Sequence, residues 1–503
     1  MNNVKIGWAK REISMEGPLS LPGQMYLRIS TGVLDPTYAT ALCVDGGEGQ
    51  DAVIFCACDR EGFYRDVVQQ VQDRAKAMRP ELPSDAIIMN TTHTHAGAEI
   101  NDTPETSPDG KPIYPGAKYR EFFIQQCADA ICEAWDTRKE GGIAFGYGYA
   151  VVGHSRRVIY SVDEYTNNVS MSAPNGYGVM YGKTNKPIFS HYEAGADHFV
   201  NLLYTFDANE KLTGMICNVP CPSQLSEHFC QMTADFWHDV RTLVQKEYGE
   251  NVYVLPQCAA AGDLSPRILH YGKAQARRMA LKYGMEYDPS KSNDYNKVMS
   301  ERYDIAERIK LAIDEVLSWA KKDIRTQLPV HHTRKIVELK RRMITEAERD
   351  WCQGNLDKLK KQLEEKLAEA AGDPDKVRLA VSNYEIVRNK NLAGIKRFET
   401  QHEDPTMSYP IHVASIGEAA FASNPFELYM DYMHRMQARS PYLQTFVIQL
   451  AGANNAGYLA TERGIYNKGY SASLFCNRIS AEGGQQLVEA TLETLAELKA
   501  KDE

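Results

Sequence analysis

The sequence predicts a mixed α/β protein with an α+β layered core, and three observations support this prediction. Short apolar runs typical of buried strands alternate with segments in which apolar residues recur every three or four positions. The composition is globular, because 43% of the 503 residues are apolar and 24% are charged. A charged, helix-rich block between residues 268 and 403 interrupts the alternation. We therefore expect a layered core that carries a helical insertion.

The first half of the chain contains the clearest strand and helix patterns. Four short apolar segments are rich in strand-forming residues and read as buried strands: Ala52–Cys58, Ala86–Met89, Phe199–Phe206 and Val252–Leu255. Between them, Tyr64–Met78 and Tyr119–Trp135 have the apolar spacing of helices that pack on one face. Strands that alternate with helices in this way are typical of a layered core.

The charged block is predicted to be helical. Within Glu346–Ala371, one face carries four leucines, namely Leu356, Leu359, Leu363 and Leu367. Gly354 and the break at residues 372–374 are expected to interrupt the helices. Strand-like sequence resumes at Ile411–Phe421 and Thr445–Leu450. We therefore divide the chain into a first core part (1–325), a helical insertion or lid (326–405) and a second core part (406–503).

Charge and cysteine usage exclude several classes of protein. The formal net charge of -9 disfavours a nucleic-acid partner. No segment approaches the roughly 18 consecutive apolar residues of a membrane span, and the first residues lack the apolar centre of a secretory signal. The eleven cysteines are odd in number and several lie in apolar runs, which is typical of a reducing compartment. We expect a soluble cytoplasmic protein.

Four polar clusters follow predicted strands, where the sites of α/β proteins usually form. Residues 90–97 contain His93 and His95, and residues 257–266 contain Asp263 and Ser265. Residues 423–427 end in Glu427, and residues 454–459 contain Tyr458. Two histidines two positions apart point to the same side of an extended strand, and imidazole is a common zinc ligand. Each cluster alone is equally consistent with strand-end hydrogen bonding or a helix cap.

Taken in order, these segments resemble the neutral/alkaline non-lysosomal ceramidase family. The sequence His-Thr-His-Ala-Gly at 93–97 and Gly-Asp-Leu-Ser-Pro at 262–266 are its most specific parts. The opening at residues 6–14 is also similar to the start of that family. The similarity covers most of residues 4–267 and 410–490, whereas the helical block is poorly matched. The resemblance implies a neutral-ceramidase-like catalytic domain.

The resemblance also implies a single zinc ion. His93, Glu427 and Tyr458 match three ligands of that family, but Cys221 stands where its second histidine is expected. A cysteine thiolate is itself a competent zinc ligand, and His228 is a substitute if its loop folds back. Three interpretations remain: a zinc site of unusual composition, a site for another metal, or an inactive protein without metal.

Further positions match residues that act on the substrate in that family. The resemblance implies that His95 shuttles a proton, that Arg156 contacts the substrate and that Tyr470 contacts the scissile carbonyl. Ser265 corresponds to a functionally important serine, and Asp263 accompanies it in the same motif.

Together these residues predict hydrolysis of an amide bond by metal-activated water. A small N-acyl compound or another soluble amide is the first expectation for the substrate, and a ceramide-like lipid is the second. An ester or lactone hydrolase with the same site and a ligand-binding pseudoenzyme are the alternatives. The sequence leaves the oligomeric state open.

Overall fold

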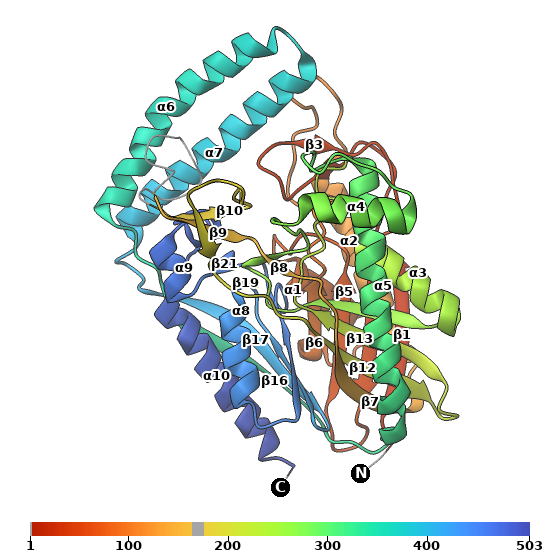
Figure 1. The fold of residues 1–503 in the computed structure, drawn as a ribbon. Coiled ribbons are helices and arrows are strands. Elements are labelled where there is room, and N and C mark those ends of the chain that lie inside the picture. Colours follow the sequence, from red (N-terminus) through yellow and green to blue (C-terminus); the bar gives the residue numbers. More distant parts are fainter. Residues whose placement is uncertain (1–2, 163–175, 503) are drawn as a thin grey trace.

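The computed structural model describes residues 3–162 and 176–502, and within them the strands form two large sheets that face each other (Figure 1). The larger sheet has eight strands in this part of the chain. In spatial order they are β14 (Tyr253–Cys258), β13 (Leu212–Val219), β12 (Phe199–Asp207), β7 (Lys139–Tyr149), β1 (Lys5–Glu12), β4 (Tyr38–Asp45), β5 (Ala52–Cys58) and β6 (Ile87–Thr91). The pairs β13–β14 and β5–β6 are parallel, and the other neighbours are antiparallel.

The smaller sheet has four strands among the described residues. They are β16 (Val330–Lys340), β17 (Thr406–Ile416), β18 (Ala419–Ser423) and β20 (Gln444–Ile448), of which β18 and β20 run parallel. The remaining strands are short: β2 (Ser20–Leu21), β3 (Arg28–Ile29), β8 (His154–Ser155), β9 (Arg157–Tyr160), β10 (Gly178–Met180), β11 (Phe189–Tyr192), β15 (Leu264–Ser265), β19 (Glu427–Leu428) and β21 (Tyr458–Leu459).

Helices cover the outer faces of both sheets and complete four layers. The helices are α1 (Val67–Met78), α2 (Gly116–Asp136), α3 (Phe236–Tyr248), α4 (Gly272–Tyr283), α5 (Tyr295–Ala320), α6 (Glu346–Ala370), α7 (Pro374–Thr400), α8 (Met430–Arg439), α9 (Glu462–Asn467) and α10 (Ala481–Lys499). α1 and α2 pack on one half of the larger sheet, and α3 and α5 pack on the other half. α8 and α10 cover the smaller sheet (Figure 1). The predicted layered α/β core is confirmed.

A continuous apolar core lies between the two sheets. It joins Leu42 and Phe55 of the larger sheet to Ile416, Phe421 and Phe446 of the smaller one, all of them fully buried. The rings of Phe55 and Phe421 meet with centroids 4.8 Å apart. The two core parts of the chain therefore share one interior.

The long helices α6 and α7 form a hairpin that projects from the body of the protein (Figure 1). Thr345 caps α6 in a reciprocal pair with Glu348, and Asp373 caps α7 ahead of Pro374. Gly372, with φ 82°, makes the break between them as predicted. Gly354 does not interrupt a helix, because α6 runs through it. That expectation was wrong, since one glycine costs a helix only about 1 kcal/mol.

Two further elements differ from expectation. The segment Ile411–Phe421 is not one strand, because Gly417 adopts φ 57° and turns the chain between β17 and β18. The range 326–405 contains a core strand, β16, ahead of the helical hairpin. In the part of the chain that the structure describes, we find no helix with the length and apolarity that a bilayer crossing requires.

Candidate functional site

The candidate site lies where the carboxyl ends of the parallel strand pairs of both sheets meet. The chain leaves β6 just before His93, leaves β18 just before Glu427 and leaves β20 ahead of Tyr458. Backbone hydrogen bonds join these ends: Gly452 N donates to Met89 O at 2.8 Å, and Gln449 N donates to Cys258 O at 3.0 Å. Three predicted site residues from distant segments are thereby brought together.

His93 is held in one orientation by its own backbone and by Glu61. Its φ of 63° is a left-handed value that is rare for a residue other than glycine. Ring Nδ1 lies 2.5 Å from the carbonyl oxygen of Glu61, and ring Nε2 lies 3.2 Å from Oε2 of Glu427. Because a carbonyl oxygen only accepts, Nδ1 must carry the proton. In a neutral ring, Nε2 then presents a lone pair directly to a carboxylate.

Two facing lone pairs require a cation between them, which is either a proton on Nε2 or a metal ion. Burial lowers the pKa of His93, but the nearby Glu427 carboxylate outweighs it and the pKa is raised overall. Burial alone would raise the pKa of Glu427, but His93 and Arg156 bring it below its usual range. Both groups are almost inaccessible to water, with side-chain exposures of 2% and 9%.

Tyr458 and Arg156 complete this side of the site. Glu427 and Tyr458 are direct neighbours in the parallel pair β19–β21. The guanidinium of Arg156 donates to the Tyr458 hydroxyl at 3.1 Å and lies 3.8 Å from Oε2 of Glu427. It also donates to the carbonyl oxygen of Gly262 at 3.0 Å. Burial raises the pKa of Tyr458 well above its usual value, so the hydroxyl keeps its proton at neutral pH.

His95 lies edge-on to His93, with ring centroids 5.0 Å apart, and has different partners. The side-chain amide of Gln224 donates to its Nε2 at 2.8 Å, and its Nδ1 lies 3.2 Å from Oε2 of Glu227. Burial lowers the pKa of His95 to about 4, and the proximity of His93 adds to this effect. His95 is therefore neutral at physiological pH, and its unprotonated nitrogen is Nε2, which accepts from Gln224.

The predicted residues of the 262–266 motif take part in local hydrogen bonding. Oδ1 of Asp263 accepts from the backbone N of Met430 at 3.1 Å, at the start of α8. Burial raises the pKa of Asp263 to about 6. Oγ of Ser265 accepts from the backbone N of Arg267 at 3.1 Å, and Ser265 is fully buried. Both contacts are turn and cap interactions, which the sequence could not separate from a catalytic role.

Tyr470 lies at the rim of the site. Its ring is perpendicular to that of Tyr458, with centroids 6.1 Å apart. Burial raises the pKa of its hydroxyl well above the usual value, so the hydroxyl remains a hydrogen-bond donor. The ammonium of Lys390, on α7, lies 5.8 Å from the centre of the same ring.

Cys221 and His228 do not join His93 and Glu427 in a compact ligand group. The thiol of Cys221 is fully buried and donates to the carbonyl oxygen of Pro222 at 3.5 Å. Burial raises its pKa well above the usual value, and the neighbouring Cys258 adds to the rise. His228 lies 3.2 Å from the hydroxyl of Tyr26. Among the described residues, neither is part of a group of three or more His, Cys, Asp or Glu residues whose ligand atoms lie within 4.8 Å of one another.

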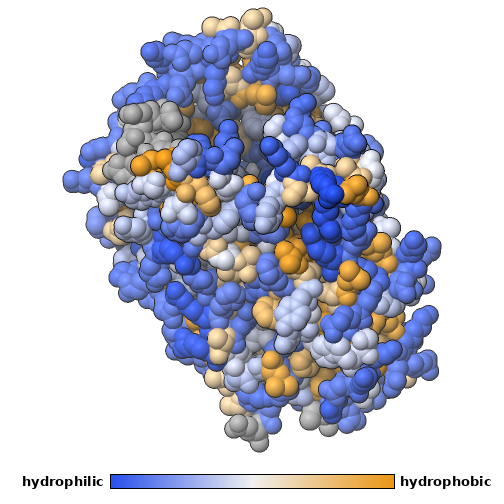
Figure 2. Space-filling view, viewed as in Figure 1, coloured by the Kyte–Doolittle hydropathy of each residue, from blue (hydrophilic) through white to orange (hydrophobic). Residues whose placement is uncertain are grey.

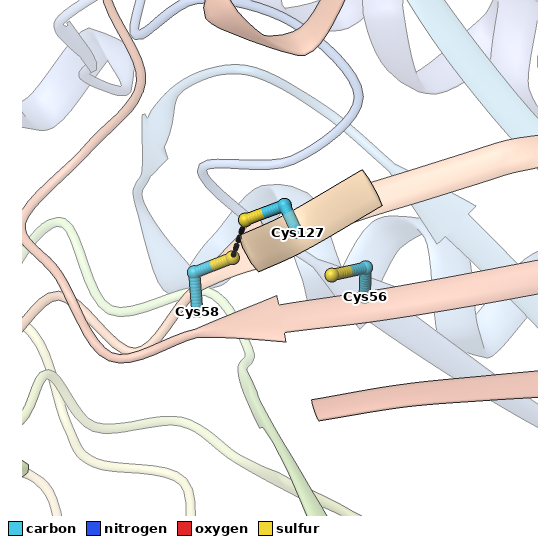
Figure 3. A group of neighbouring side chains, drawn as sticks. All are labelled: Cys56, Cys58 and Cys127. Carbon is cyan, nitrogen blue, oxygen red and sulfur yellow. Dashed lines mark hydrogen bonds between the residues drawn. The ribbon is translucent and has the colours of Figure 1, made fainter. Parts of the chain in front are cut away.

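Three cysteines do form such a group (Figure 3). Cys56 and Cys58 on β5 face Cys127 on α2, and their sulfur atoms lie within 4.8 Å of one another. The sulfur atoms of Cys58 and Cys127 are 3.7 Å apart. Each is fully buried in the apolar core beneath α1 and α2, and burial raises the pKa of Cys58 well above its usual range. In this setting they pack as small apolar side chains.

Sequence reasoning did not select Glu61, Gln224 and Glu227, which contact the two histidines. Burial would raise the pKa of Glu227, but Arg267 and His95 bring it well below its usual range. Each of the three follows a strand: Glu61 follows β5, and the other two follow β13. His93 was selected because it lies in a polar cluster that follows a strand. The same criterion would have selected these three residues, but no short motif marks them.

The sequence matches no family model and no curated protein. Its fold does match solved structures. The neutral ceramidase from Pseudomonas aeruginosa aligns with all of this chain and 75% of its own, with a TM-score of 0.67 and 15% identity. A ceramidase complexed with C2 aligns with all of this chain and 76% of its own, with a TM-score of 0.64 and 14% identity. The chain therefore has a neutral-ceramidase-like fold, as the resemblance implied.

Proposed function

We propose that this protein is a metal-dependent hydrolase that cleaves an amide bond in an N-acyl substrate. The observation that supports it best is the pair of facing lone pairs on His93 and Glu427, buried together at 3.2 Å beside Tyr458. Such an arrangement is unfavourable unless a cation occupies it. The similarity of fold to ceramidases is consistent with this chemistry.

The donor set is chemically suited to zinc. Two donors bound to a tetrahedral zinc ion lie about 3.3 Å apart, which matches the separation of Nε2 and Oε2 in His93 and Glu427. Tyr458 would be the third ligand, and catalytic zinc sites commonly use three protein ligands and leave one position open. Cys221 is therefore not needed to complete the site. A zinc ion bound there supplies a Lewis acid that polarises a carbonyl and makes water a nucleophile near neutral pH.

The surrounding side chains have matching roles. Hydrolysis joins the oxygen of water to the carbonyl carbon, breaks the C–N bond and delivers a proton to the leaving nitrogen. We assign the proton transfer to His95, which is neutral and backed by the Glu227 carboxylate. Arg156 and Tyr470 are hydrogen-bond donors to the negative charge that develops on the carbonyl oxygen, a contribution of about 3 kcal/mol per donor in known enzymes.

The size of the adjoining cavity favours a small substrate. A cavity of about 290 Å³ is lined by both polar and apolar residues, among them Gly23, which lies against His95, and Glu61, whose carbonyl oxygen contacts His93. Ligand pockets usually span roughly 300–1,000 Å³, so this one is at the small end. A small N-acyl compound is therefore our first proposal, and a ceramide-like lipid is the second.

The decisive experiment combines metal analysis with hydrolysis by untagged protein. We expect about one zinc per chain and cleavage of short N-acyl amides. His93→Ala should lose both metal and activity, whereas His95→Ala should lose activity by a factor of about 100 or more and retain its metal. Cys221→Ser serves as the matched control and should retain the metal. Equal metal loss in the two histidine variants would refute this division of roles.

Two alternative functions give different results in the same experiment. An ester or lactone hydrolase could use the same site, because the transition states are alike. It would bind the metal and cleave esters but not amides. A ligand-binding pseudoenzyme would contain no metal and cleave neither class. Either result would overturn the amidase proposal.

A further inference from the structure

The cavity of about 290 Å³ lies beneath the α6–α7 hairpin, where this face of the molecule is hollowed (Figure 2). Ile386 of α7 and Leu27 contribute apolar walls. Gly23 also lines it and lies against His95, because a Cβ added to Gly23 would be 2.3 Å from Cγ of that ring. Glu61, whose carbonyl oxygen orients His93, lies on another side. Two residues of the cavity wall therefore contact the histidines of the proposed reaction centre.

Two carboxylates line the cavity, Glu61 and Glu99. Oε1 of Glu61 accepts from the Tyr64 hydroxyl at 3.0 Å, whereas its Oε2 is buried and has no hydrogen-bond partner. Oε1 of Glu99 accepts three hydrogen bonds of 2.9 Å, from the backbone N of Ile100 and from the backbone and side-chain nitrogens of Asn101. Within the described residues, neither carboxylate forms an ion pair with a lysine or an arginine.

The other carboxylates of the site do have cationic partners. Glu427 faces His93 and Arg156, and Glu227 is paired with Arg267. A buried carboxylate oxygen with no partner is costly, and the cost is removed when a positively charged donor binds it. Among the described residues, Glu61 and Glu99 therefore lack the cationic partner that Glu427 and Glu227 have.

We propose that this cavity binds the ammonium group of a substrate, through Glu61 and Glu99. The proposal rests on the proposed amidase function and specifies its substrate class. The substrate would be a short N-acyl compound whose amide lies at His93 and His95. A few methylene groups would pass the apolar wall formed by Leu27 and Ile386, and a terminal amine would end at the two carboxylates.

The test compares two probes that differ only in charge, N-acetyl-1,4-diaminobutane and N-acetyl-4-aminobutanol. In the wild-type protein, kcat/KM should favour the cationic probe by about tenfold or more. In Glu61→Gln and in Glu99→Gln this preference should fall to about twofold or less. Glu105→Gln removes an exposed charge outside the cavity and should keep the full preference. An unchanged preference in both cavity variants would overturn the proposal.

Calorimetry with n-butylamine and n-butanol separates the subsite from the reaction. If the wild-type protein binds the amine more tightly than the alcohol, and both glutamine variants lose that selectivity, the subsite is supported even without hydrolysis. Selective binding of the amine without hydrolysis would refute only the proposed function. If neither molecule is preferred, the subsite is refuted whatever the catalytic activity. The two substitutions keep a hydrogen-bond acceptor at each position, and far-UV circular dichroism checks that the variants are folded.

Discussion

At the residue scale, His93 and His95 are only two positions apart and yet have opposite electrostatic environments. His93 faces the carboxylate of Glu427, which raises its pKa, whereas burial lowers the pKa of His95 to about 4. Titratable neighbours whose pKa values are driven apart are typical of sites that divide binding from proton transfer. Because of this contrast we assign metal binding to His93 and proton transfer to His95.

We expect a second pair of histidines to make the stability of the protein dependent on pH. His412 on β17 is fully buried, and its Nδ1 lies 3.1 Å from Nε2 of His332 on β16. Burial lowers the pKa of His412 to about 3 and that of His332 to about 4. In the unfolded chain both values return to about 6.5. At pH values between the folded and unfolded pKa values, the unfolded chain binds protons that the folded chain does not. Stability therefore falls as pH falls.

We therefore expect the free energy of unfolding to decrease by a few kcal/mol between about pH 7.5 and pH 5. His412→Gln should show a smaller decrease, because it removes one of the two groups. Urea unfolding at both pH values measures the effect, and His402→Gln, which alters an exposed histidine, is the control. An equal loss in the wild-type protein and in His412→Gln would refute the explanation.

Residue patterns predicted which loops meet at the candidate site better than they predicted the geometry there. The His-x-His argument assumed an extended chain, but His93 has a left-handed φ of 63°. Its carbonyl partner, Glu61, is distant in sequence and carries no motif. The resemblance proposed Cys221 as a ligand, and the structure places its thiol against Pro222 O. Such details depend on side-chain rotamers and long-range contacts, which a local pattern does not contain.

At the scale of elements, α7 braces the segment that borders the cavity. Oγ of Ser382 accepts from the backbone N of Leu27 at 3.1 Å, and Nδ2 of Asn383 donates to the carbonyl oxygen of Met25 at 3.0 Å. The segment between residues 22 and 27 includes Gly23, which lies against His95. The hairpin thus supports one wall of the candidate site.

Removing one of these hydrogen bonds should loosen that wall without unfolding the protein. We expect Asn383→Ala to cost about 1 kcal/mol locally and to speed amide hydrogen exchange in residues 22–27. The KM for N-acyl substrates should rise. Asn389→Ala alters an exposed asparagine on the same helix and should leave exchange unchanged. Equal protection of residues 22–27 in both variants would show that α7 is not their support.

The prediction of helices and strands succeeded where a segment showed one clear apolar pattern over a short range. β5 occupies the predicted Ala52–Cys58 range, and α6 differs from its predicted range by one residue. β16 was overlooked because its exposed face is polar and charged, which resembles the neighbouring charged helices. Its alternating burial is nonetheless that of an edge strand whose polar face discourages further pairing.

At the scale of the whole molecule, the apolar core between the two sheets unites the parts of the chain on either side of the hairpin. The layered class follows from the order of strands and helices. The face-to-face packing of the two sheets does not follow from that order, because it depends on which buried faces meet. Phe421 shows this most clearly, since its ring contacts Phe55 of the larger sheet and Phe446 of its own, with centroids 4.8 and 4.7 Å away.

Because this core is shared, damage at its centre should destabilise both halves together. Phe421→Ala should lower the free energy of unfolding by about 3–5 kcal/mol, the usual cost of truncating a fully buried phenylalanine. Leu443→Ala, at a position 79% exposed, should change it by less than about 0.5 kcal/mol. Urea unfolding is followed by tryptophan fluorescence and by far-UV circular dichroism on the same samples. We expect one transition, displaced equally in both signals. Two separate transitions in the Phe421 variant would mean that the sheets fold independently, and the single-core description would then be wrong.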